Sequence, residues 1–320
     1  MAYQTPLSIY PPDALILAPL AGYSDQAFRN AARRYGCRYA FTPLAEAGML
    51  VYGTETYHQA SLLRAPEESW LGVQLLGAKP SLIKEAVKVL NNGPYDVLDF
   101  NMGCPARKVM NRGAGAALCT NRELAKRCLE TILHESELAV TAKIRIVDQE
   151  NPDPTVALAK DLEKLGIEAL TIHGRTASQG YRGSVAMGVI RAVREELSIP
   201  VIANGGVKDM ATAETLRRET GCSRLMIARG AIGSPWIFRQ LADGSSPAFS
   251  EILDTMSTHV ATMLQLYGEE RGMRHARKIV AAYLKGTGCS AHFRHETNTL
   301  TSWRDFQELV RQIKEEVADA

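Results

Sequence analysis

The feature that most constrains the fold of this chain is a regular alternation of short apolar runs with stretches of helical periodicity. Runs rich in aliphatic and β-branched residues occur at 15–18, 39–42, 72–76, 97–101, 140–144, 169–173, 200–203 and 225–228. The stretches between them are helix-like, for example 25–35 behind a Ser24 cap and 155–165 before Gly166. Such alternation requires parallel strands joined by right-handed crossovers. Eight units in about 230 residues predict an α/β fold of the TIM (β/α)8 barrel type rather than an open doubly wound sheet.

The pattern changes after Leu241. Residues 243–247 read Asp-Gly-Ser-Ser-Pro, which is typical of a linker, and the strand signals stop there. Apolar residues then recur at helical spacing in three stripes, which begin at Ile252, Ile279 and Trp303. We therefore predict a barrel domain over 1–242 and a small C-terminal helical bundle over 248–320.

Composition excludes several classes of protein. A hydrophobic content of 46% and a charged content of 22% are typical of a folded globular protein. No apolar window approaches the roughly 18 residues of a membrane span, and the N-terminus lacks a signal peptide pattern, so we expect a cytoplasmic protein. The cysteines at 37, 104, 119, 128, 222 and 289 form no CxxC pair and no zinc-type cluster. Free thiols and no metal are expected; the sequence does not fix the oligomeric state, and a monomer is the working expectation.

Positive charge is concentrated in one segment of a nearly neutral chain. The net charge is +2, yet 271–294 contains six Lys or Arg residues, two histidines and no acidic residue. A segment of this kind is either a solvated helix face or a surface for phosphate backbones. Arg274 and Arg277 are the candidate contacts to a nucleic acid.

Polar residues and tight turns gather where the predicted strands end. In a TIM barrel these ends meet on one rim, and that rim carries the chemistry. The set comprises Pro19, Leu20 and Ala21 after the first strand, Gln74 in the third, Asn101 and Cys104 at the fourth, Lys143 and Arg145 in the fifth, His173 in the sixth, Asn204, Gly205 and Gly206 after the seventh, and Ala228 and Arg229 after the eighth.

Cys104 is the most informative of these residues. A lone cysteine is often a small buried hydrophobe, and that reading stays open from position alone. Against it stand Pro105, which stops the strand, and the basic residues Arg107, Lys108 and Arg112, which favour a partly wet, electropositive loop. A thiol in ordinary surroundings is mostly protonated at neutral pH and can serve as a general acid.

The other rim residues also have two readings each. Lys143 either points into the barrel toward an anion or extends to solvent, and His173 alone would fit a core position. Gln74 suits the edge of a flat heterocycle or simple barrel packing. Glycine-rich turns are often only turns, but turns after the seventh and eighth strands, opening the next helices, favour a phosphate site.

Taken together, the motifs resemble those of the tRNA-dihydrouridine synthases, most closely the bacterial B-type branch. The resemblance covers nearly the whole chain, and the cysteine motif is its most specific part. It is carried by 17–22 (LAPLAG) with Phe28 and Arg29, 101–109 (NMGCPARKV), 113–118 (GAGAAL), 173–176 (HGRT), 199–205 (IPVIANG), 226–231 (MIARGA) and 235–238 (PWIF).

The resemblance implies an FMN-bearing barrel, a helical domain that helps to hold tRNA, and NADPH as the reductant. It implies FMN contacts from Pro19, Leu20, Ala21, Gln74, Lys143, His173, Asn204, Gly205, Gly206, Ala228 and Arg229. Cys104 is implied as the proton donor to C5 of uracil, with Asn101 at the uracil edge and Arg145 and Arg175 near the nucleotide. Three features depart from the family pattern: Ala228 replaces a usual glycine, Met187 stands where relatives often have a tryptophan, and the atypical segment 42–49 leaves the role of Glu46 open.

Two alternatives to this function remain. One is an FMN barrel that acts on a free small molecule, and the other is a tRNA-binding protein without redox activity. The basic segment 271–294 argues against the first, and the presence of Cys104, Lys143 and His173 argues against the second. The position of the target uridine and the preference for NADPH over NADH do not follow from the sequence.

Overall fold

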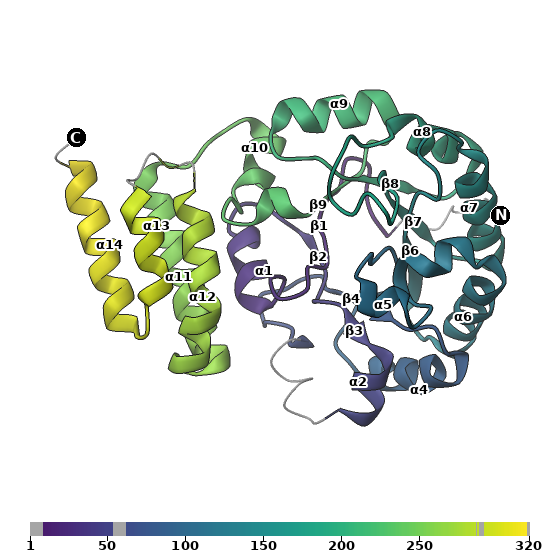
Figure 1. Cartoon of the computed structure of the whole chain (residues 1–320), viewed down its shortest axis with the longest axis horizontal. Coiled ribbons are helices and arrows are strands. Elements are labelled where there is room, and N and C mark those ends of the chain that lie inside the picture. The colour runs from purple at the N-terminus through teal and green to yellow at the C-terminus, as the bar shows by residue number, and fades with distance from the viewer. Residues whose placement is uncertain (1–8, 54–61, 286, 288–290, 319–320) are drawn as a thin grey trace, which may run out of the picture.

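A single curled parallel sheet forms the centre of the larger part of the molecule (Figure 1). The computed structural model describes residues 9–53, 62–285, 287 and 291–318. Its strands are β1 (Leu15–Leu17), β2 (Tyr39–Ala40), β3 (Ala45–Glu46), β4 (Gly72–Leu76), β5 (Val97–Met102), β6 (Ala139–Arg145), β7 (Ala169–His173), β8 (Val201–Asn204) and β9 (Leu225–Ile227). They follow the order β2-β1-β9-β8-β7-β6-β5-β4-β3, and every pairing is parallel.

The strands β2 and β3 together occupy one position of the barrel and close it. Phe41 forms a parallel bridge with Gly72, and the Thr42 amide donates to the Gly72 carbonyl at 2.9 Å. Pro43 has no amide hydrogen, so the ladder is interrupted there and resumes at β3. The eight predicted strands are confirmed with small shifts at their ends, and the main difference is that the second one is split.

Helices cover the outside of the barrel (Figure 1). They are α1 (Gln26–Arg33), α2 (Ala47–Tyr52), α4 (Pro80–Asn91), α6 (Arg122–Glu135), α7 (Asp153–Leu165), α8 (Met187–Glu196), α9 (Met210–Thr220) and α10 (Ile237–Asp243). The short α5 (Arg107–Met110) and the 3-10 turn η1 (Gly115–Thr120) belong to the connection after β5, and the 3-10 turn η2 (Arg229–Ala231) follows β9. The predicted Ser24 cap of α1 is wrong. Asp25 caps the helix by accepting from the Phe28 amide at 3.0 Å, while the Ser24 hydroxyl accepts from the Leu20 amide at 2.8 Å. Ser24 thus holds the turn after β1 instead.

Alternate residues of each strand point into the barrel, which explains the mixture of apolar and polar positions along them. The lower interior is apolar and includes Ile16, Val97, Ala169, Ile202 and Met226. Nearer to the carboxyl ends of the same strands, the residues that point into the barrel are polar. A second, larger apolar core lies between the strands and the surrounding helices.

The C-terminal part is a separate bundle with a core of its own (Figure 1). Its elements are α11 (Phe249–Tyr267), α12 (Glu269–Leu284), α13 (Ala291–Glu296), η3 (Thr297–Thr299) and α14 (Trp303–Ala318). The three predicted helices correspond to α11, α12 and α14. The short α13 was not predicted because six residues are too few to show a helical period. A TIM barrel followed by a helical bundle is therefore the observed fold.

The bundle packs against α1 through both apolar and polar contacts. Ala27 of α1 belongs to the apolar core of the bundle, and Phe28 stacks on His259 with 5.8 Å between ring centres. The Tyr267 hydroxyl donates to Asp25 at 3.0 Å. The Lys278 ammonium donates to the Gly22 carbonyl at 2.6 Å. These bonds tie the bundle to the segment that directly follows β1.

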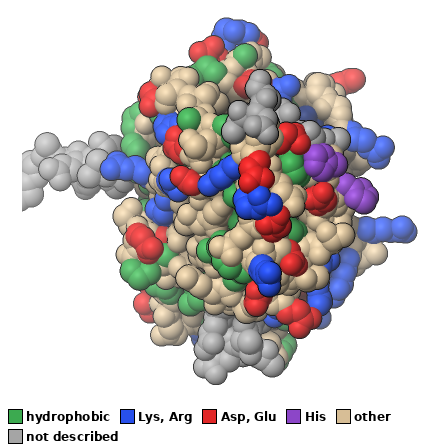
Figure 2. Space-filling model, turned by 90° about the vertical axis from the view of Figure 1, so that its left-hand side faces the viewer, with side chains coloured by type: hydrophobic (Ala, Val, Ile, Leu, Met, Phe, Trp, Pro, Cys, Tyr) green, Lys and Arg blue, Asp and Glu red, His purple; other side chains and the backbone are tan. Residues whose placement is uncertain are grey.

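Acidic and basic side chains alternate over most of the outer face of the bundle, and Lys, Arg and His side chains are more frequent along one edge of that face (Figure 2). On α14, for example, Arg311 pairs with Glu308 and Glu315. No helix in the described part of the chain is both long and apolar enough to cross a membrane. Cys37, Cys104, Cys119, Cys128 and Cys222 are free thiols, whereas Cys289 lies outside the described residues.

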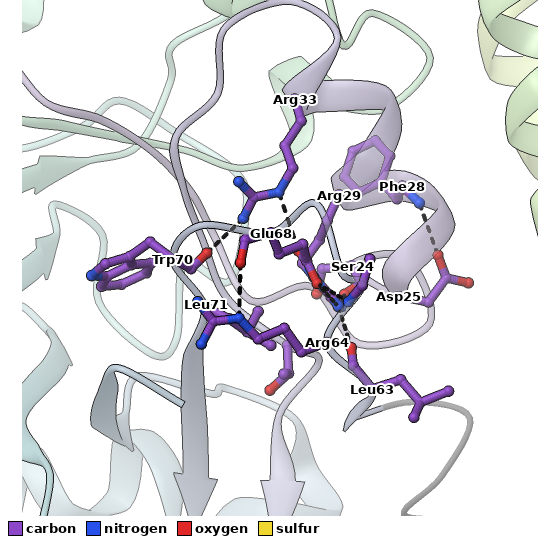
Figure 3. Close-up of polar contacts among 12 residues, drawn as sticks. Ser24, Asp25, Phe28, Arg29, Arg33, Leu63, Arg64, Glu68, Trp70 and Leu71 are labelled. Atoms are coloured by element: carbon purple, nitrogen blue, oxygen red, sulfur yellow. Dashed lines mark hydrogen bonds and ion pairs between the residues drawn. The ribbon is translucent and has the colours of Figure 1, made fainter. Parts of the chain in front are cut away.

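A buried ion-pair cluster fastens the segment before β4 to α1 (Figure 3). Glu68 accepts from Arg29 through two bonds of 2.9 Å, and both side chains have no exposed surface. Glu68 also accepts from Arg33 at 3.2 Å and from the Ala65 amide at 2.9 Å. Burial by itself raises the pKa of Glu68, but these donors outweigh it and hold the pKa below its usual value. The cluster fixes the approach to β4, the strand that carries Gln74.

Candidate active site

A cavity of about 400 Å³ opens at the carboxyl ends of the barrel strands. Such a volume is typical of a small-molecule or cofactor site. Every predicted site residue except Arg274 and Arg277 lines it: Pro19, Leu20, Ala21, Gln74, Asn101, Cys104, Lys143, Arg145, His173, Arg175, Asn204, Gly205, Gly206, Ala228 and Arg229. The structure therefore brings together residues that the sequence spreads over more than half of the chain.

Strand register explains why these side chains meet. Neighbouring strands pair Gln74 with Asp99 and Asn101 with Lys143, so their inward-facing residues lie at matched heights. Farther around the barrel, His173 pairs with Arg145 on one side and with Asn204 on the other. The result is a polar ring above the apolar lower interior.

Cys104 lies in the loop after β5 and is only partly buried, whereas the other four described cysteines are buried. Its amide and that of Gly103 both donate to the Asn101 side-chain oxygen, at 3.0 and 3.1 Å. The Cys104 carbonyl accepts from the Ala116 amide at 3.0 Å. Arg145 donates from Nε to the Gly103 carbonyl at 2.7 Å. Cys104 is thus not a buried core residue: it lines the cavity in a loop held at several points.

Lys143 extends from β6 into the mouth of the barrel. Its ammonium donates to Asn204 Oδ1 at 2.8 Å, and Asn204 Nδ2 donates to the Met226 carbonyl at 2.7 Å. Burial lowers the pKa of Lys143 to about 8, although the nearby Asp99 carboxyl raises it. This residue supplies a cation whose charge an anionic ligand would stabilise.

His173 is the buried histidine of the ring. Burial lowers its pKa far below the usual value, and the charges of Lys143, Arg145, Arg175 and Arg229 lower it further. The imidazole is therefore neutral and can donate one hydrogen bond and accept another. A Cβ at Gly205, whose φ is +127°, would lie 2.9 Å from His173 Cδ2, so only glycine fits beside this ring.

Positive charge dominates the cavity. Among the described residues that line it, Lys143, Arg145, Arg175, Lys208 and Arg229 are cationic and none is acidic. Arg145 and Arg175 are buried, and each guanidinium donates to a carbonyl of the loop after β7. Arg145 donates to Gly180 at 2.7 Å, and Arg175 donates to Gly183 at 3.0 Å. They shape the loop after β7 as well as charging the site.

Among the described lining residues with a charged or aromatic side chain, Tyr181 and Lys208 were not predicted from the sequence. Tyr181 is exposed at the rim, with the Arg229 guanidinium 4.5 Å and that of Arg145 5.5 Å from its ring centre. Lys208 follows the glycine pair after β8. A rim aromatic in a glycine-rich loop and a lysine close behind a glycine turn were the available signals, but both lie beyond the strand ends.

Some local expectations need correction. Gly205 and Gly206 do not open the next helix, because α9 begins at Met210 with Asp209 as its cap. Ala228 is instead followed directly by the short turn η2. Glu46, whose role the sequence left open, pairs with Arg112 in a half-exposed ion pair. Arg112 is thus partly neutralised and contributes less positive charge to the cysteine loop than predicted.

Arg274 and Arg277 lie on α12 in the bundle and do not line the cavity. Arg274 is exposed and pairs with Glu270 at 2.9 Å within the same helix. Arg277 is only partly exposed, and its Nε donates to the Leu300 carbonyl at 2.8 Å. Arg277 therefore links α12 to the segment after η3. The described residues hold no group of three or more His, Cys, Asp or Glu side chains that could bind a metal ion.

Structural comparison agrees with the barrel. A histamine dehydrogenase from a Rhizobium species matches with a TM-score of 0.56 at 12% identity, over 95% of this chain and 62% of that longer enzyme. The old yellow enzyme homologue of Zymomonas mobilis matches with a TM-score of 0.54 at 11% identity, over 73% of this chain and 90% of its own. At such identities the likeness concerns the fold alone.

Sequence comparison is more specific. The family model for dihydrouridine synthase matches residues 16–318. A tRNA-dihydrouridine synthase B of Shewanella oneidensis is 36% identical over 95% of this chain and 96% of its own. A probable tRNA-dihydrouridine synthase of Rickettsia conorii is 33% identical over 93% of this chain and 92% of its own. Because these matches span both the barrel and the bundle, the chain belongs to the dihydrouridine synthase family.

Proposed function

We propose that this protein reduces the C5=C6 bond of specific uridines in tRNA, with FMN in the barrel cavity, NADPH as the source of electrons and Cys104 as the proton donor. The observation that carries the proposal is the position of Cys104. Its thiol lines the same cavity as the ring of Lys143, His173 and Arg229, so one ligand-sized space offers both a flavin site and an acid.

The residues present fit FMN. A flavin mononucleotide combines a flat heterocycle with a phosphate, and the cavity combines amide and imidazole groups with five cations. Gln74, Lys143 and His173 are the proposed partners of the heterocycle, and the turns at 204–206 and 228–229 are the proposed phosphate contacts. The alanine at 228 keeps its backbone amide, so the substitution of the family glycine is compatible with phosphate binding.

When bound, FMN supplies the hydride that adds to C6 of the uracil ring. The electron pair of the broken C5=C6 bond is then left at C5, and the Cys104 thiol donates a proton to that carbon. Over the whole reaction, NADPH is the source of the hydride, and solvent returns the proton to the Cys104 thiolate. Asn101, Arg145 and Arg175 are the proposed contacts to the nucleotide, with Asn101 also orienting the cysteine loop.

The target base is stacked inside folded tRNA, so it must be turned out of the stack to reach this cavity. We propose that residues 1–242 form the catalytic domain and that 248–320 hold the tRNA, with Arg274 and Arg277 among the contacts of the basic segment. The contacts of α12 with the segment after β1 support this division, since they place the bundle next to the barrel rim. A tRNA substrate implies action in the cytoplasm.

The test is the Cys104→Ala variant. We expect the purified wild-type protein to be yellow with bound FMN, and the variant to keep the flavin while losing most uridine reduction. Serine at the same position is the matched control for size, because it replaces the thiol by a hydroxyl of much weaker acidity. A colourless wild-type protein, or an alanine variant of normal activity, would contradict the proposal. Turnover of a free pyrimidine without tRNA would favour the small-molecule alternative instead.

A further inference from the structure

One carboxyl group lies deep in the barrel and does not line the cavity. Asp99 is on β5, two residues before Asn101, and is 1% exposed. It accepts two hydrogen bonds of 2.7 Å, one from Gln74 Nε2 and one from the Thr141 hydroxyl. A buried carboxylate is costly unless it is well bonded, so its place directly below the site calls for a physical reason.

The hydrogen bonds continue from Asp99 to the cysteine loop. Gln74 donates to Asp99, and its Oε1 accepts from Asn101 Nδ2 at 2.6 Å. Asn101 Oδ1 in turn accepts from the amides of Gly103 and Cys104. Three side chains on two adjacent strands thus connect the interior of the barrel to the backbone of the residue that carries the thiol.

The direction of this series of hydrogen bonds is set by the groups at its two ends. A carboxylate only accepts and a backbone amide only donates, whereas the two side-chain amides between them can be turned either way. With Asp99 at one end, Gln74 must present its nitrogen downward and its oxygen toward Asn101. Asn101 must then present its oxygen to the cysteine loop. An apolar residue at position 99 would remove one of the two ends that select this orientation and would leave Gln74 Nε2 without its acceptor, so that Gln74 and Asn101 would be held from the loop end alone.

From this geometry we infer that Asp99 is a positioning residue for the proposed reduction: it orients Gln74 and Asn101 and thereby holds the Cys104 loop in place. The inference rests on the proposed role of Cys104 as the acid. Arg145 tethers the same loop from the other side through the Gly103 carbonyl, so the loop would shift rather than unfold without Asp99.

The charge balance around Asp99 agrees with this role. Burial raises the pKa of Asp99 to about 6, while Gln74, Thr141 and the charge of Lys143 lower it. At neutral pH the group is therefore mainly the carboxylate that the hydrogen-bond directions require.

The experiment compares Asp99→Leu with Thr141→Val. Leucine has nearly the shape of aspartate and removes the acceptor of Gln74. The Thr141→Val variant removes a different buried hydrogen bond to the same carboxylate and leaves the hydrogen bonds from Asp99 to the Cys104 loop intact. Asp99→Ala, which adds no apolar bulk, is the second disrupting variant, so the test does not depend on the leucine variant folding. Asp99→Asn can still accept from Gln74 and is the conservative rescue.

Two quantities are measured on the flavin-loaded protein. The first is the rate at which iodoacetamide alkylates Cys104, followed by mass spectrometry of its peptide, which needs no turnover. The second is kcat and KM for uridine reduction in unmodified tRNA. In the Leu and Ala variants we expect several-fold faster alkylation and a kcat about 10- to 100-fold lower, because a small displacement of the acid is enough for such a loss. The KM for tRNA should be unchanged.

The Thr141→Val and Asp99→Asn variants should retain wild-type alkylation and most of kcat. If Thr141→Val matches Asp99→Leu in both measurements, the effect is only the cost of an unpaired buried group and the inference fails. Wild-type values in the Leu and Ala variants would also overturn it. Failure of the proposed function is recognised separately, since Cys104→Ala would then be active whatever happens at Asp99.

Discussion

The sharpest test of the fold concerns Glu68, the side chain that accepts from both Arg29 and Arg33 in the buried cluster shown in Figure 3. The Glu68→Gln substitution keeps the shape but removes the charge and turns one acceptor oxygen into a donor. Arg29 would then face an NH2 group while remaining fully buried. Breaking a buried ion pair from one side costs about 3 to 5 kcal/mol. The bonds from Arg29 to the Ser24 and Leu63 carbonyls would survive and limit the loss.

The assay is thermal unfolding at neutral pH, followed by circular dichroism. For a chain of this length the unfolding entropy converts that cost into a decrease in Tm of about 4 to 8 °C. The control is Glu85→Gln, which breaks an exposed pair with Lys88 on α4 and should leave Tm unchanged. An equal decrease in Tm in the two variants would refute this explanation, because the two ion pairs differ in burial.

The effect should also depend on pH. Since the fold lowers the pKa of Glu68, its contribution is complete above the unfolded-state pKa and is lost as the pH falls through the folded-state value. The Tm difference between wild type and Glu68→Gln should therefore be constant near neutral pH and shrink below about pH 4. A difference that grows on acidification would show that another group controls it.

Four further predictions concern the site and the bundle. FMN affinity should weaken as the pH rises above about 8, where Lys143 loses its proton, and the Lys143→Met variant should lack this dependence; binding titrations by flavin fluorescence test it. The Gly205→Ala substitution should weaken FMN binding about 10- to 100-fold through strain and contact with His173, a result that the same titration would contradict if affinity were retained. Arg277→Ala should lower stability by about 1 to 3 kcal/mol by freeing the Leu300 carbonyl, measured by urea unfolding. Arg274→Ala should leave stability unchanged but reduce the salt slope of tRNA binding by about one; an unchanged slope would assign Arg274 to a solvated helix face.

Much of the fold followed from local signals. Short apolar runs and helical patterns marked all eight barrel positions, because a buried parallel strand is a short continuous apolar run, whereas an amphipathic helix repeats its apolar residues every three or four positions. The split of the second strand was missed because it depends on Pro43 and on the close approach of Phe41 to Gly72 across the closing seam. Helix α13 was missed because it is too short to show a period, and the cap at Asp25 because two adjacent residues offered the same chemistry.

Some residues of the candidate site could likewise be predicted from the sequence, and others could not. The residue types at the strand ends could be identified from the sequence, because parallel strands of a barrel bring those ends to one rim. Tyr181 could not, since it lies in a loop whose course depends on the bonds of Arg145 and Arg175. Lys208 could not either, since it lies beyond the strand end in the turn before α9, where its amide donates to the Thr212 hydroxyl. The position of Arg277 against Leu300, and hence its structural role, likewise required the packed bundle.

The sequence by itself determined the alternation of strands and helices, the change to a helical tail after residue 241, and the chemical groups available at the rim. These are local properties, because they depend on the spacing of apolar residues and on the residue types along the sequence. Only the tertiary structure decided how the groups are connected: that Asp99 sets the direction of Gln74 and Asn101, that Asn101 holds Cys104, and that Glu68 secures two arginines. Hydrogen bonds depend on distances and directions between residues far apart in the chain, and those are defined only when the barrel closes and its strands take their register.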